Sequence, residues 1–218
     1  MNLFIIGDVH GCFYTFKAML EFWDPSKEIL IQLGDLIDRG NYTPEVVKLC
    51  REIQKEHPNS VFLKGNHEWS ALQYYHKSKD DKWYDKFGKQ VLWQYVIAER
   101  KFEEDAEWMK TMKTYWENEH IMVSHAGISV SPFCMDENHY SGLLWHRLEI
   151  KGLKKVQVYG HTPVKGNKPA FDPKTNSYNI DTGAYLGKSL TGIKLDEKGV
   201  LLETHTIHTI EKDIKTSL

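Results

Sequence analysis

The segment GDLIDRG, residues 34–40, directly follows the apolar run Ile29–Leu33. A run of this length predicts a buried strand, so Asp35 lies where the strand ends, and Asp38 and Arg39 lie in the loop beyond it. A carboxylate at the position of Asp35 can bridge two metal ions. The same residues also fit an ordinary strand end with an Asx-turn and an exposed Asp–Arg pair. The segment alone does not distinguish these two interpretations, and the rest of the chain decides between them.

The composition of the 218-residue chain is typical of a globular protein with one domain. Hydrophobic residues make up 41% and charged residues 27% of the chain, which excludes an intrinsically disordered protein. The net charge is -2 and the positive charges are scattered, so we expect no nucleic-acid-binding surface. No apolar run is long enough to cross a membrane, and the short run Leu3–Ile6 lacks the features of a signal peptide.

The three cysteines, Cys12, Cys50 and Cys134, are an odd number and lack the CxxC spacing of many metal and redox sites. This pattern predicts free thiols, which persist in a reducing compartment. We therefore expect a cytoplasmic protein, and we expect it to be a monomer with no membrane partner.

Polar residues follow the predicted strands at the point where each strand ends. The predicted strands are Leu3–Ile6, Ile29–Leu33, Val61–Leu63, His120–Val123 and Val156–Tyr159. The polar residues that follow them are Asp8, His10, Asp35, Asn66, His67, His125 and His161. In a sheet connected by crossover helices, sites gather at the carboxyl ends of the strands. One histidine at a strand end is usually structural, but the recurrence at five strand ends argues against that interpretation.

These candidate ligands are oxygen and nitrogen donors and include no cysteine. Such a set suits a site that binds Mn, Fe or Zn through oxygen and nitrogen atoms. It does not resemble a structural zinc site, which is rich in thiolates. The set is larger than one ion needs, so we expect two divalent ions, which share a carboxylate and lie about 3.5–4 Å apart with a hydroxide between them. The residues predicted to bind the first ion are Asp8, His10 and Asp35. The residues predicted to bind the second ion are Asp35, Asn66, His125 and His161.

The order of the predicted elements indicates an α/β fold. In the first part of the chain, strands alternate with helices expected at Phe13–Trp23 and from Thr43 to about His57, the latter with Thr43 as its N-cap. A helical block follows at about 69–118, and the last part consists mainly of strands that end in a hairpin within 189–207. We expect two mixed sheets packed as a sandwich with helices outside, in a single domain of residues 1–218 that carries the helical block as an insertion.

Five motifs occur along the chain in a fixed order. They are GDVHG at 7–11, GDLIDRG at 34–40, GNHE at 65–68, HAG at 125–127 and GHT at 160–162. As an ordered set they resemble the calcineurin-like metallophosphoesterase superfamily, and more narrowly the phosphoprotein phosphatase family of serine/threonine phosphatases. The short length and the segments 145–147 and 180–184 are most similar to the small bacterial and bacteriophage lambda type. The resemblance implies a four-layer fold and the two-metal site assigned above.

The resemblance also implies a role for each remaining site residue. His67 would protonate the leaving alkoxide, and Asp38 would orient His67 and stabilise its positive charge. Arg39, Asn66 and Arg147 would hold the phosphoryl oxygens. These roles match the chemistry, because hydrolysis of a phosphate monoester needs a strong nucleophile, charge neutralisation and protonation of a poor leaving group.

Two of these residues have a competing interpretation in the sequence. Arg147 is placed by a match of only three residues, and an ion pair with Glu149 or a role at a helix end is the alternative. Asp181, in the segment Ile180–Ala184, fits a turn-forming residue better than a metal ligand.

Three functions fit this set of residues. The first is a manganese-dependent phosphatase that hydrolyses phosphoserine and phosphothreonine on proteins. In this reaction a hydroxide that bridges the metal ions would attack the phosphate in line with the leaving group. The second is a hydrolase of dinucleoside polyphosphates such as diadenosine tetraphosphate, whose leaving group is good, so that His67 would matter less. The third is an inactive metal-binding scaffold, against which the retention of all ligands together with His67 and Asp38 argues.

Overall fold

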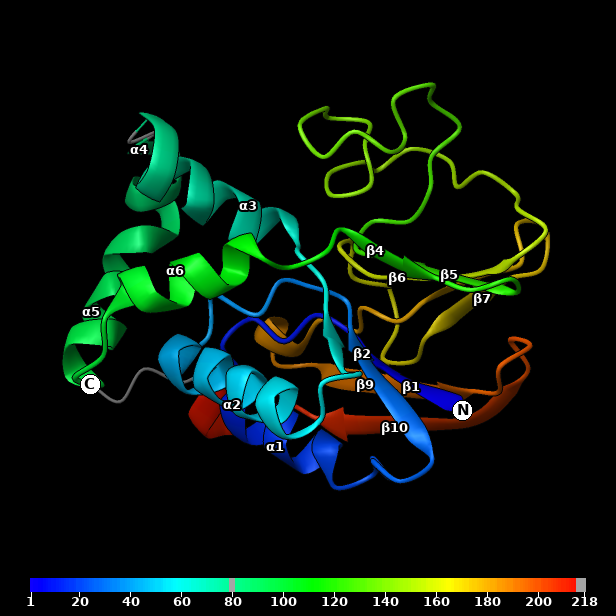
Figure 1. The fold of residues 1–218 in the computed structure, drawn as a ribbon, viewed down its shortest axis with the longest axis horizontal. Helices are drawn as coiled ribbons and strands as arrows, with labels where there is room; N and C mark the ends of the chain where they lie inside the picture. The colour runs from blue at the N-terminus through cyan, green and yellow to red at the C-terminus, as the bar shows by residue number, and fades with distance from the viewer. Residues whose placement is uncertain (79–80, 215–218) are drawn as a thin grey trace.

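Two five-stranded sheets form the centre of the molecule (Figure 1). The computed structural model describes residues 1–78 and 81–214. The first sheet contains, in spatial order, β10 (Leu201–His208), β9 (Ser189–Leu195), β1 (Asn2–Ile6), β2 (Glu28–Gln32) and β3 (Val61–Phe62). The second contains β4 (Tyr115–Glu117), β5 (Ile121–Ser124), β6 (Val156–Tyr159), β8 (Ser177–Asn179) and β7 (Ala170–Asp172). Parallel and antiparallel neighbours occur in both sheets, which confirms the predicted mixed sheets.

Strand β1 shows why the two sheets pack against each other. Both of its faces are apolar, as is typical of a strand that is covered on both sides. Leu3 and Ile5 lie in a core between the sheets, which they share with Val123 of β5. Phe4 and Ile6 alternate with them and lie in a second core on the opposite face. Alternate side chains of this strand therefore pack on opposite faces: one set against the other sheet and the other set in the core on the outer face.

Helices α1 (Phe13–Leu20) and α2 (Thr43–Glu56) cover the outer face of the first sheet (Figure 1). Phe16 and Met19 of α1 and Val47 of α2 are fully buried there, on the apolar stripe that the sequence pattern predicts. Each helix follows a strand and leads to the next parallel strand. The carboxyl ends of β1, β2 and β3 therefore all point to the same edge of the sheet.

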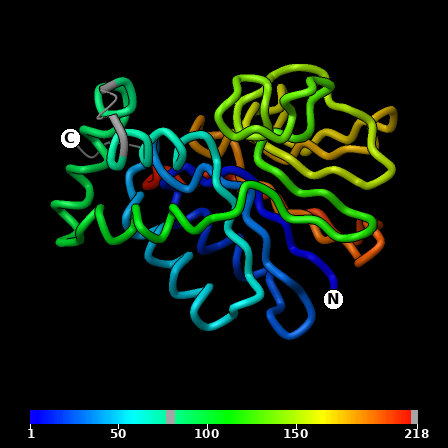
Figure 2. The backbone as a smooth tube through the Cα atoms, turned by 45° about the horizontal axis from the view of Figure 1, so that its top comes forward, coloured from blue at the N-terminus to red at the C-terminus, as the bar shows by residue number. Residues whose placement is uncertain are grey.

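The segment 125–153 provides the outermost layer over part of the second sheet. Met122 of β5 packs there against Ile128, Leu143 and Leu144. This segment consists of turns and irregular structure and not of a helix. In Figures 1 and 2, it lies on one side of the molecule, while the helical block lies on the other.

The helical block is confirmed in part. It contains α3 (Asn66–Gln73), α4 (Asp81–Trp83), α5 (Lys89–Ile97) and α6 (Phe102–Lys110), with turns of π-helix at Tyr74–Ser78 and Tyr84–Gly88. The prediction that helix continues to Trp116 is wrong. Residues 115–117 form β4, which pairs antiparallel with β5, and Trp116 packs against the core between the sheets. Aromatic residues favour strands, and the partner strand decides the outcome over this short segment.

Other boundaries move by a few residues. Helix α1 ends at Leu20 and not at Trp23. The N-cap of α2 is Tyr42, so Thr43 is the first helical residue, and its backbone N–H donates to the side chain of Gln94. Strand β7 was not predicted because its three residues are too few to show periodicity.

Two predictions about the chain as a whole can be compared with the structure. Cys12, Cys50 and Cys134 are free thiols, as expected. Among the helices of residues 1–78 and 81–214, none is long and apolar enough to span a membrane.

Candidate active site

Seven side chains that were predicted as ligands or catalytic groups lie at the carboxyl ends of five strands. They follow β1 (Asp8 and His10), β2 (Asp35), β3 (Asn66 and His67), β5 (His125) and β6 (His161). The strands belong to both sheets, so the site lies at the common edge of the sandwich. Residues that are far apart in the sequence meet there. For example, the backbone N–H of His161 donates a hydrogen bond of 3.0 Å to Oδ2 of Asp8, 153 residues away.

The ligand atoms fall into two groups that share Asp35. One group contains His10, Asp35 and His67, and the other contains Asp35, His125 and His161, with the ligand atoms of each group within 4.8 Å of one another. Oδ2 of Asp35 lies 3.3 Å from Nε2 of His10, and Oδ1 lies 3.5 Å from Nε2 of His125. Each carboxylate oxygen thus faces one group, which is the arrangement that a bridging ligand needs.

Asn66 joins the second group through its amide oxygen. This oxygen lies 2.9 Å from Nε2 of His125 and 2.9 Å from Nδ1 of His161. The two histidine nitrogens are themselves 3.2 Å apart. The four predicted ligands of the second ion therefore converge on one point.

Backbone carbonyl groups fix which nitrogen of each histidine faces the site. Nδ1 of His10 lies 3.0 Å from the carbonyl oxygen of Ile37, and Nδ1 of His125 lies 3.0 Å from that of Leu33. Nε2 of His161 lies 3.1 Å from the carbonyl oxygen of Trp145. An N–H that donates to a carbonyl leaves a lone pair on the other ring nitrogen, which is how metal-binding histidines are commonly oriented.

Burial keeps these histidines neutral. It lowers the pKa of His10 and His125 below their usual range and the pKa of His161 to about 3. A neutral imidazole is the form that can coordinate a cation. The three rings are therefore already in the protonation state that ligation requires.

Asp8 supplies the observation that a cation would best explain. Its Oδ1 atom is buried and has no hydrogen-bond partner among the described residues. Burial, followed by the charges of Asp181 and Asp35, raises the pKa of Asp8 well above its usual range. Buried carboxylates that crowd together need a positive charge to balance them. Asp8, which was predicted to bind the first ion with His10, is not in the group of His10, Asp35 and His67, but its Oδ2 atom accepts a hydrogen bond from the backbone N–H of His161 in the second group.

The backbone of the site is held in an uncommon conformation. The site residues with positive φ angles, from 48° to 71°, are His10, Asp35, Asp38, Arg39 and His161. This left-handed conformation costs on the order of 1 kcal/mol or more for each non-glycine residue, and it is concentrated at functional sites. Glycines make room beside it: a Cβ atom at Gly65 would collide with the Asp35 carboxylate, and one at Gly160 with the Asp8 carboxylate.

His67 and Asp38 form a buried pair next to the ligand groups. Nδ1 of His67 lies 2.5 Å from Oδ2 of Asp38, and Trp83 donates its indole N–H to the same oxygen at 3.0 Å. Burial acts to lower the pKa of His67, but the charge of Asp35 and the hydrogen bond to Asp38 outweigh it and raise this pKa above its ordinary value. His67 therefore holds a proton more strongly than the other histidines of the site.

The two predicted phosphate-binding arginines line a groove beside His67. This groove has a volume of about 410 Å³ and its wall includes Asn66 and His161. Nη2 of Arg39 lies 3.4 Å from Nε2 of His67, and its guanidinium lies 4.0 Å from the ring centroid of Tyr185. Arg147 donates to the hydroxyl of Thr162 at 2.9 Å and also lines the groove, so the structure gives it a contact other than the alternative ion pair with Glu149.

Asp181 behaves as the sequence analysis expected of a turn residue. Its Oδ1 atom accepts a hydrogen bond from the backbone N–H of Gly183 at 2.9 Å. The side chain is buried, and burial raises its pKa to about 6. Asp181 is thus a turn residue whose carboxyl group adds to the acidic character of the site.

Glu68 was not among the predicted site residues, but its side chain supports the site. Its fully buried carboxylate accepts hydrogen bonds from the backbone N–H groups of Asp35 and Gly65 with one oxygen, and from those of Leu36 and Ile37 with the other. Burial and the charge of Asp35 raise its pKa to about 7, whereas the backbone donors act to lower it. Glu68 therefore positions the loop that carries Asp35 and Asp38, and does so from the start of α3.

We expect Glu68→Gln to weaken this support. A glutamine amide would place an NH₂ group against two of the backbone N–H donors and leave them unsatisfied. Because each buried, unsatisfied group costs about 1–3 kcal/mol, we expect the free energy of unfolding of the metal-free protein to fall by about 2–4 kcal/mol. Denaturant titration measures this change, and Glu56→Gln, an exposed change at the end of α2, is the control. Equal stability of both variants would show that Glu68 does not support the loop.

The chain is similar in sequence to known phosphoesterases. A family model described as calcineurin-like phosphoesterase matches residues 1–186. The chain is 27% identical to serine/threonine-protein phosphatase 1 of Salmonella typhimurium, over 87% of this chain and 90% of the relative. It is 26% identical to the asymmetrical bis(5'-nucleosyl)-tetraphosphatase PrpE of Bacillus cereus, over 92% of this chain and 93% of the relative.

A solved structure shows the same fold at lower sequence identity. The protein serine/threonine phosphatase from Saccharomyces cerevisiae superposes with a TM-score of 0.70 and 17% identity, over 97% of this chain and 81% of that one. The family match covers most of the chain, including all the strand ends described above, and it agrees with the resemblance found in the sequence motifs. The chain therefore belongs to the calcineurin-like phosphoesterase family, whose members depend on a pair of metal ions.

Proposed function

We propose that this phosphoesterase hydrolyses phosphate monoesters, and specifically phosphoserine and phosphothreonine on proteins. The observation that carries the proposal is the buried pair of His67 and Asp38 beside the two ligand groups. An alkoxide is a poor leaving group and needs a proton as it departs. A histidine whose pKa is raised by a buried carboxylate is suited to supply that proton.

The ligand groups fit a pair of divalent ions held through Asp35. When bound, such ions lower the pKa of water and neutralise charge on the phosphoryl group. Asp8 and His10 would serve one ion, and Asn66, His125 and His161 the other. We propose Mn, with Fe or Zn as alternatives, because the donor set contains carboxylate, amide and imidazole groups and no thiolate.

Each remaining residue has a role that follows from its position. Arg39 and Arg147, which both line the groove, would bind the phosphoryl oxygens, a task for which the guanidinium fork is well shaped. His67 would transfer the proton on its Nε2 atom to the leaving oxygen, while its Nδ1 atom stays hydrogen-bonded to Asp38. Asp38 would hold the ring in place and stabilise its positive charge, while the indole N–H of Trp83 keeps Asp38 fixed.

A dinucleoside polyphosphate is the second candidate substrate. It is supported by the relative named bis(5'-nucleosyl)-tetraphosphatase, to which the chain is 26% identical. Both candidates use the same ligand groups. They differ in the leaving group, since a phosphate leaves without the proton that an alkoxide needs.

One assay separates the candidates. The protein is loaded with Mn, and phosphate release is followed from phosphoserine and phosphothreonine peptides beside diadenosine tetraphosphate. We expect turnover of the phosphopeptides. Turnover of the dinucleotide alone would reject the proposal in favour of the second candidate, and turnover of neither substrate with Mn, Fe or Zn would indicate an inactive scaffold.

A further inference from the structure

The groove beside His67 extends from the site to the helical block. Its wall includes Lys82 of α4 and Lys86 of the following turn, together with the aromatic side chains of Trp83 and Phe87. Lys82 and Lys86 are four residues apart, so they lie on the same face of this helical stretch. Both side chains are exposed. The helical block thus adds two ammonium groups to a groove that already contains two guanidinium groups.

Contacts with the ring of Phe87 place one of these lysines, Lys86, close to the proposed proton donor. The ring centroid of Phe87 lies 4.9 Å from that of His67. Nζ of Lys86 lies 5.0 Å from the same Phe87 centroid. His67 and Lys86 therefore both lie beside the ring of Phe87. Because His67 faces the leaving group in the proposed reaction, this part of the groove lies on the leaving-group side of the substrate.

The charges in this groove are of one sign. Among the described residues in its wall, the charged side chains are Arg39, Lys82, Lys86 and Arg147, and none is acidic. Walls of one sign concentrate ligands of the opposite sign and raise their rate of association. The groove is therefore suited to a substrate that carries negative charge beyond the phosphate that is cleaved.

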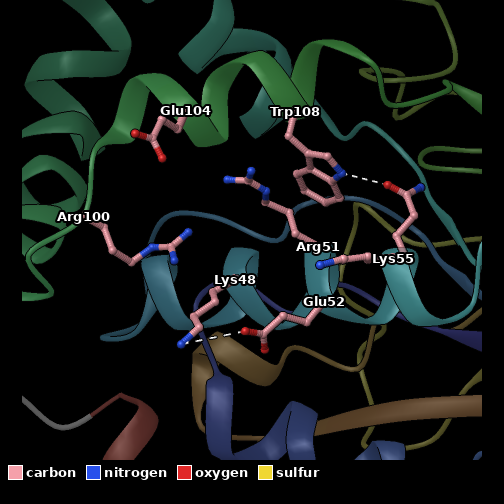
Figure 3. Close-up of a pocket in the computed structure, with 8 residues that line it drawn as sticks. Lys48, Arg51, Glu52, Lys55, Arg100, Glu104 and Trp108 are labelled. Atoms are coloured by element: carbon pink, nitrogen blue, oxygen red, sulfur yellow. Dashed lines mark hydrogen bonds and ion pairs between the residues drawn. The ribbon is translucent and has the colours of Figure 1, made fainter.

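Another cavity with four cationic side chains lacks this property (Figure 3). It has a volume of about 570 Å³, lies between α2 and α6, and is also lined by acids. Lys48 pairs with Glu52 at 3.8 Å. Arg51 and Arg100 both bind the buried carboxylate of Asp105, which stabilises the packing of the helices. Three of the four cations thus have acidic partners within the protein, and the wall of this cavity itself contains acidic residues. It is therefore a weaker candidate for an anionic ligand than the groove, whose described wall contains none.

We propose that Lys82 and Lys86 form a subsite for acidic side chains next to the phosphorylated residue of a protein substrate. The inference rests on the proposed function and narrows its substrate class to acidic phosphorylated segments. Lysine suits this task because its ammonium group is a flexible point charge and does not demand one fixed geometry. Phe87 and Trp83 would support the aliphatic stems and the substrate backbone.

The test compares three phosphothreonine peptides that differ only in the residues flanking the phosphate: aspartate, asparagine or lysine. We expect the native protein to prefer the aspartate peptide, and this preference to shrink at high salt, because exposed charges are screened. In Lys82→Ala/Lys86→Ala, kcat/KM for the aspartate peptide should fall about fivefold, as expected for two exposed charge pairs, mainly through KM. The asparagine peptide should change by less than about twofold, since it has no charge to pair.

Two controls make the result specific. Hydrolysis of p-nitrophenyl phosphate, which lacks flanking groups, should be unchanged in the double variant. Lys89→Ala removes a nearby exposed lysine that pairs with Asp85 at 2.7 Å, and it should leave the peptide preference intact. Anisotropy of the fluorescein-labelled peptides with metal-free protein measures the same preference without turnover.

The inference and the proposed function fail in different ways. If the double variant retains the aspartate preference of the native protein in both binding and turnover, the subsite is refuted while the phosphatase activity stands. If the native protein hydrolyses none of the peptides, the proposed function fails, and the anisotropy measurement still decides whether the lysines bind acidic segments.

Discussion

Asp35→Asn is expected to remove both metal ions together and to lower kcat/KM by about a thousandfold or more. Asp35 is the residue common to the two ligand groups, with Oδ2 toward His10 and Oδ1 toward His125. An amide has one oxygen and no charge, so it cannot serve both groups. Losing several kcal/mol of charge stabilisation in the transition state corresponds to a loss of this size.

The metal content after dialysis, measured by mass spectrometry, tests this prediction alongside the kinetics. Asp181→Asn is the matched control, because Asp181 is also a buried acid of the cluster but forms a turn with Gly183, and an asparagine can still accept that hydrogen bond. We expect its activity to stay within about tenfold of the native protein. An Asp35→Asn protein that retains one tightly bound ion per chain would refute the shared-ligand role of Asp35.

His67→Asn should separate substrates by the quality of their leaving group. For a phosphoserine peptide, we expect kcat to fall by about 10²–10⁴, the usual contribution of a general acid. For p-nitrophenyl phosphate, whose leaving group needs little protonation, we expect a loss of less than about tenfold. The asparagine can still contact Asp38, which limits any structural change at this buried position.

The comparison is made on kcat at saturating substrate. His57→Asn, at the end of α2 and outside the site, should leave both activities unchanged. Equal losses on the two substrates in His67→Asn would contradict the role of His67 as proton donor and would suggest that it acts by holding the ligand groups in place.

The grouping of the candidate site residues at one edge of the sandwich was predictable, because the sequence pattern that marks each of them is local. Asp8, Asp35 and His161 each follow a short apolar run and a glycine, and the carboxyl ends of neighbouring strands meet at one edge. The alternation of strands and helices in the first part of the chain, together with the strands of the last part, likewise predicted two mixed sheets, although not the strands β4 and β7 of the second. The resemblance of the ordered motifs to a known family then agreed with the family match over residues 1–186.

The supporting contacts were not predictable because they depend on distant parts of the chain. The carboxylate of Glu68 binds the backbone of Asp35, which is 33 residues away. Glu68 ends the motif GNHE, but the motif does not indicate this distant partner. The left-handed backbone of Asp38 and Arg39 is equally hidden, because neither residue type requires it. Only the folded surroundings hold these residues in that conformation.

The error at residues 115–117 has a related cause. Trp116 fits the helical spacing of the preceding block, and a short apolar segment can satisfy the patterns of both helix and strand. Pairing with β5 and burial against the core between the sheets decide for the strand. Neither interaction is visible in the local sequence.

In the proposed site, residues from both sheets hold a pair of metal ions through Asp35. Anomalous diffraction from crystals soaked in Mn tests it most directly. We predict two adjacent peaks that both contact Asp35, one beside His10 and the other between His125 and His161. A single peak, or peaks that do not contact Asp35, would contradict the account.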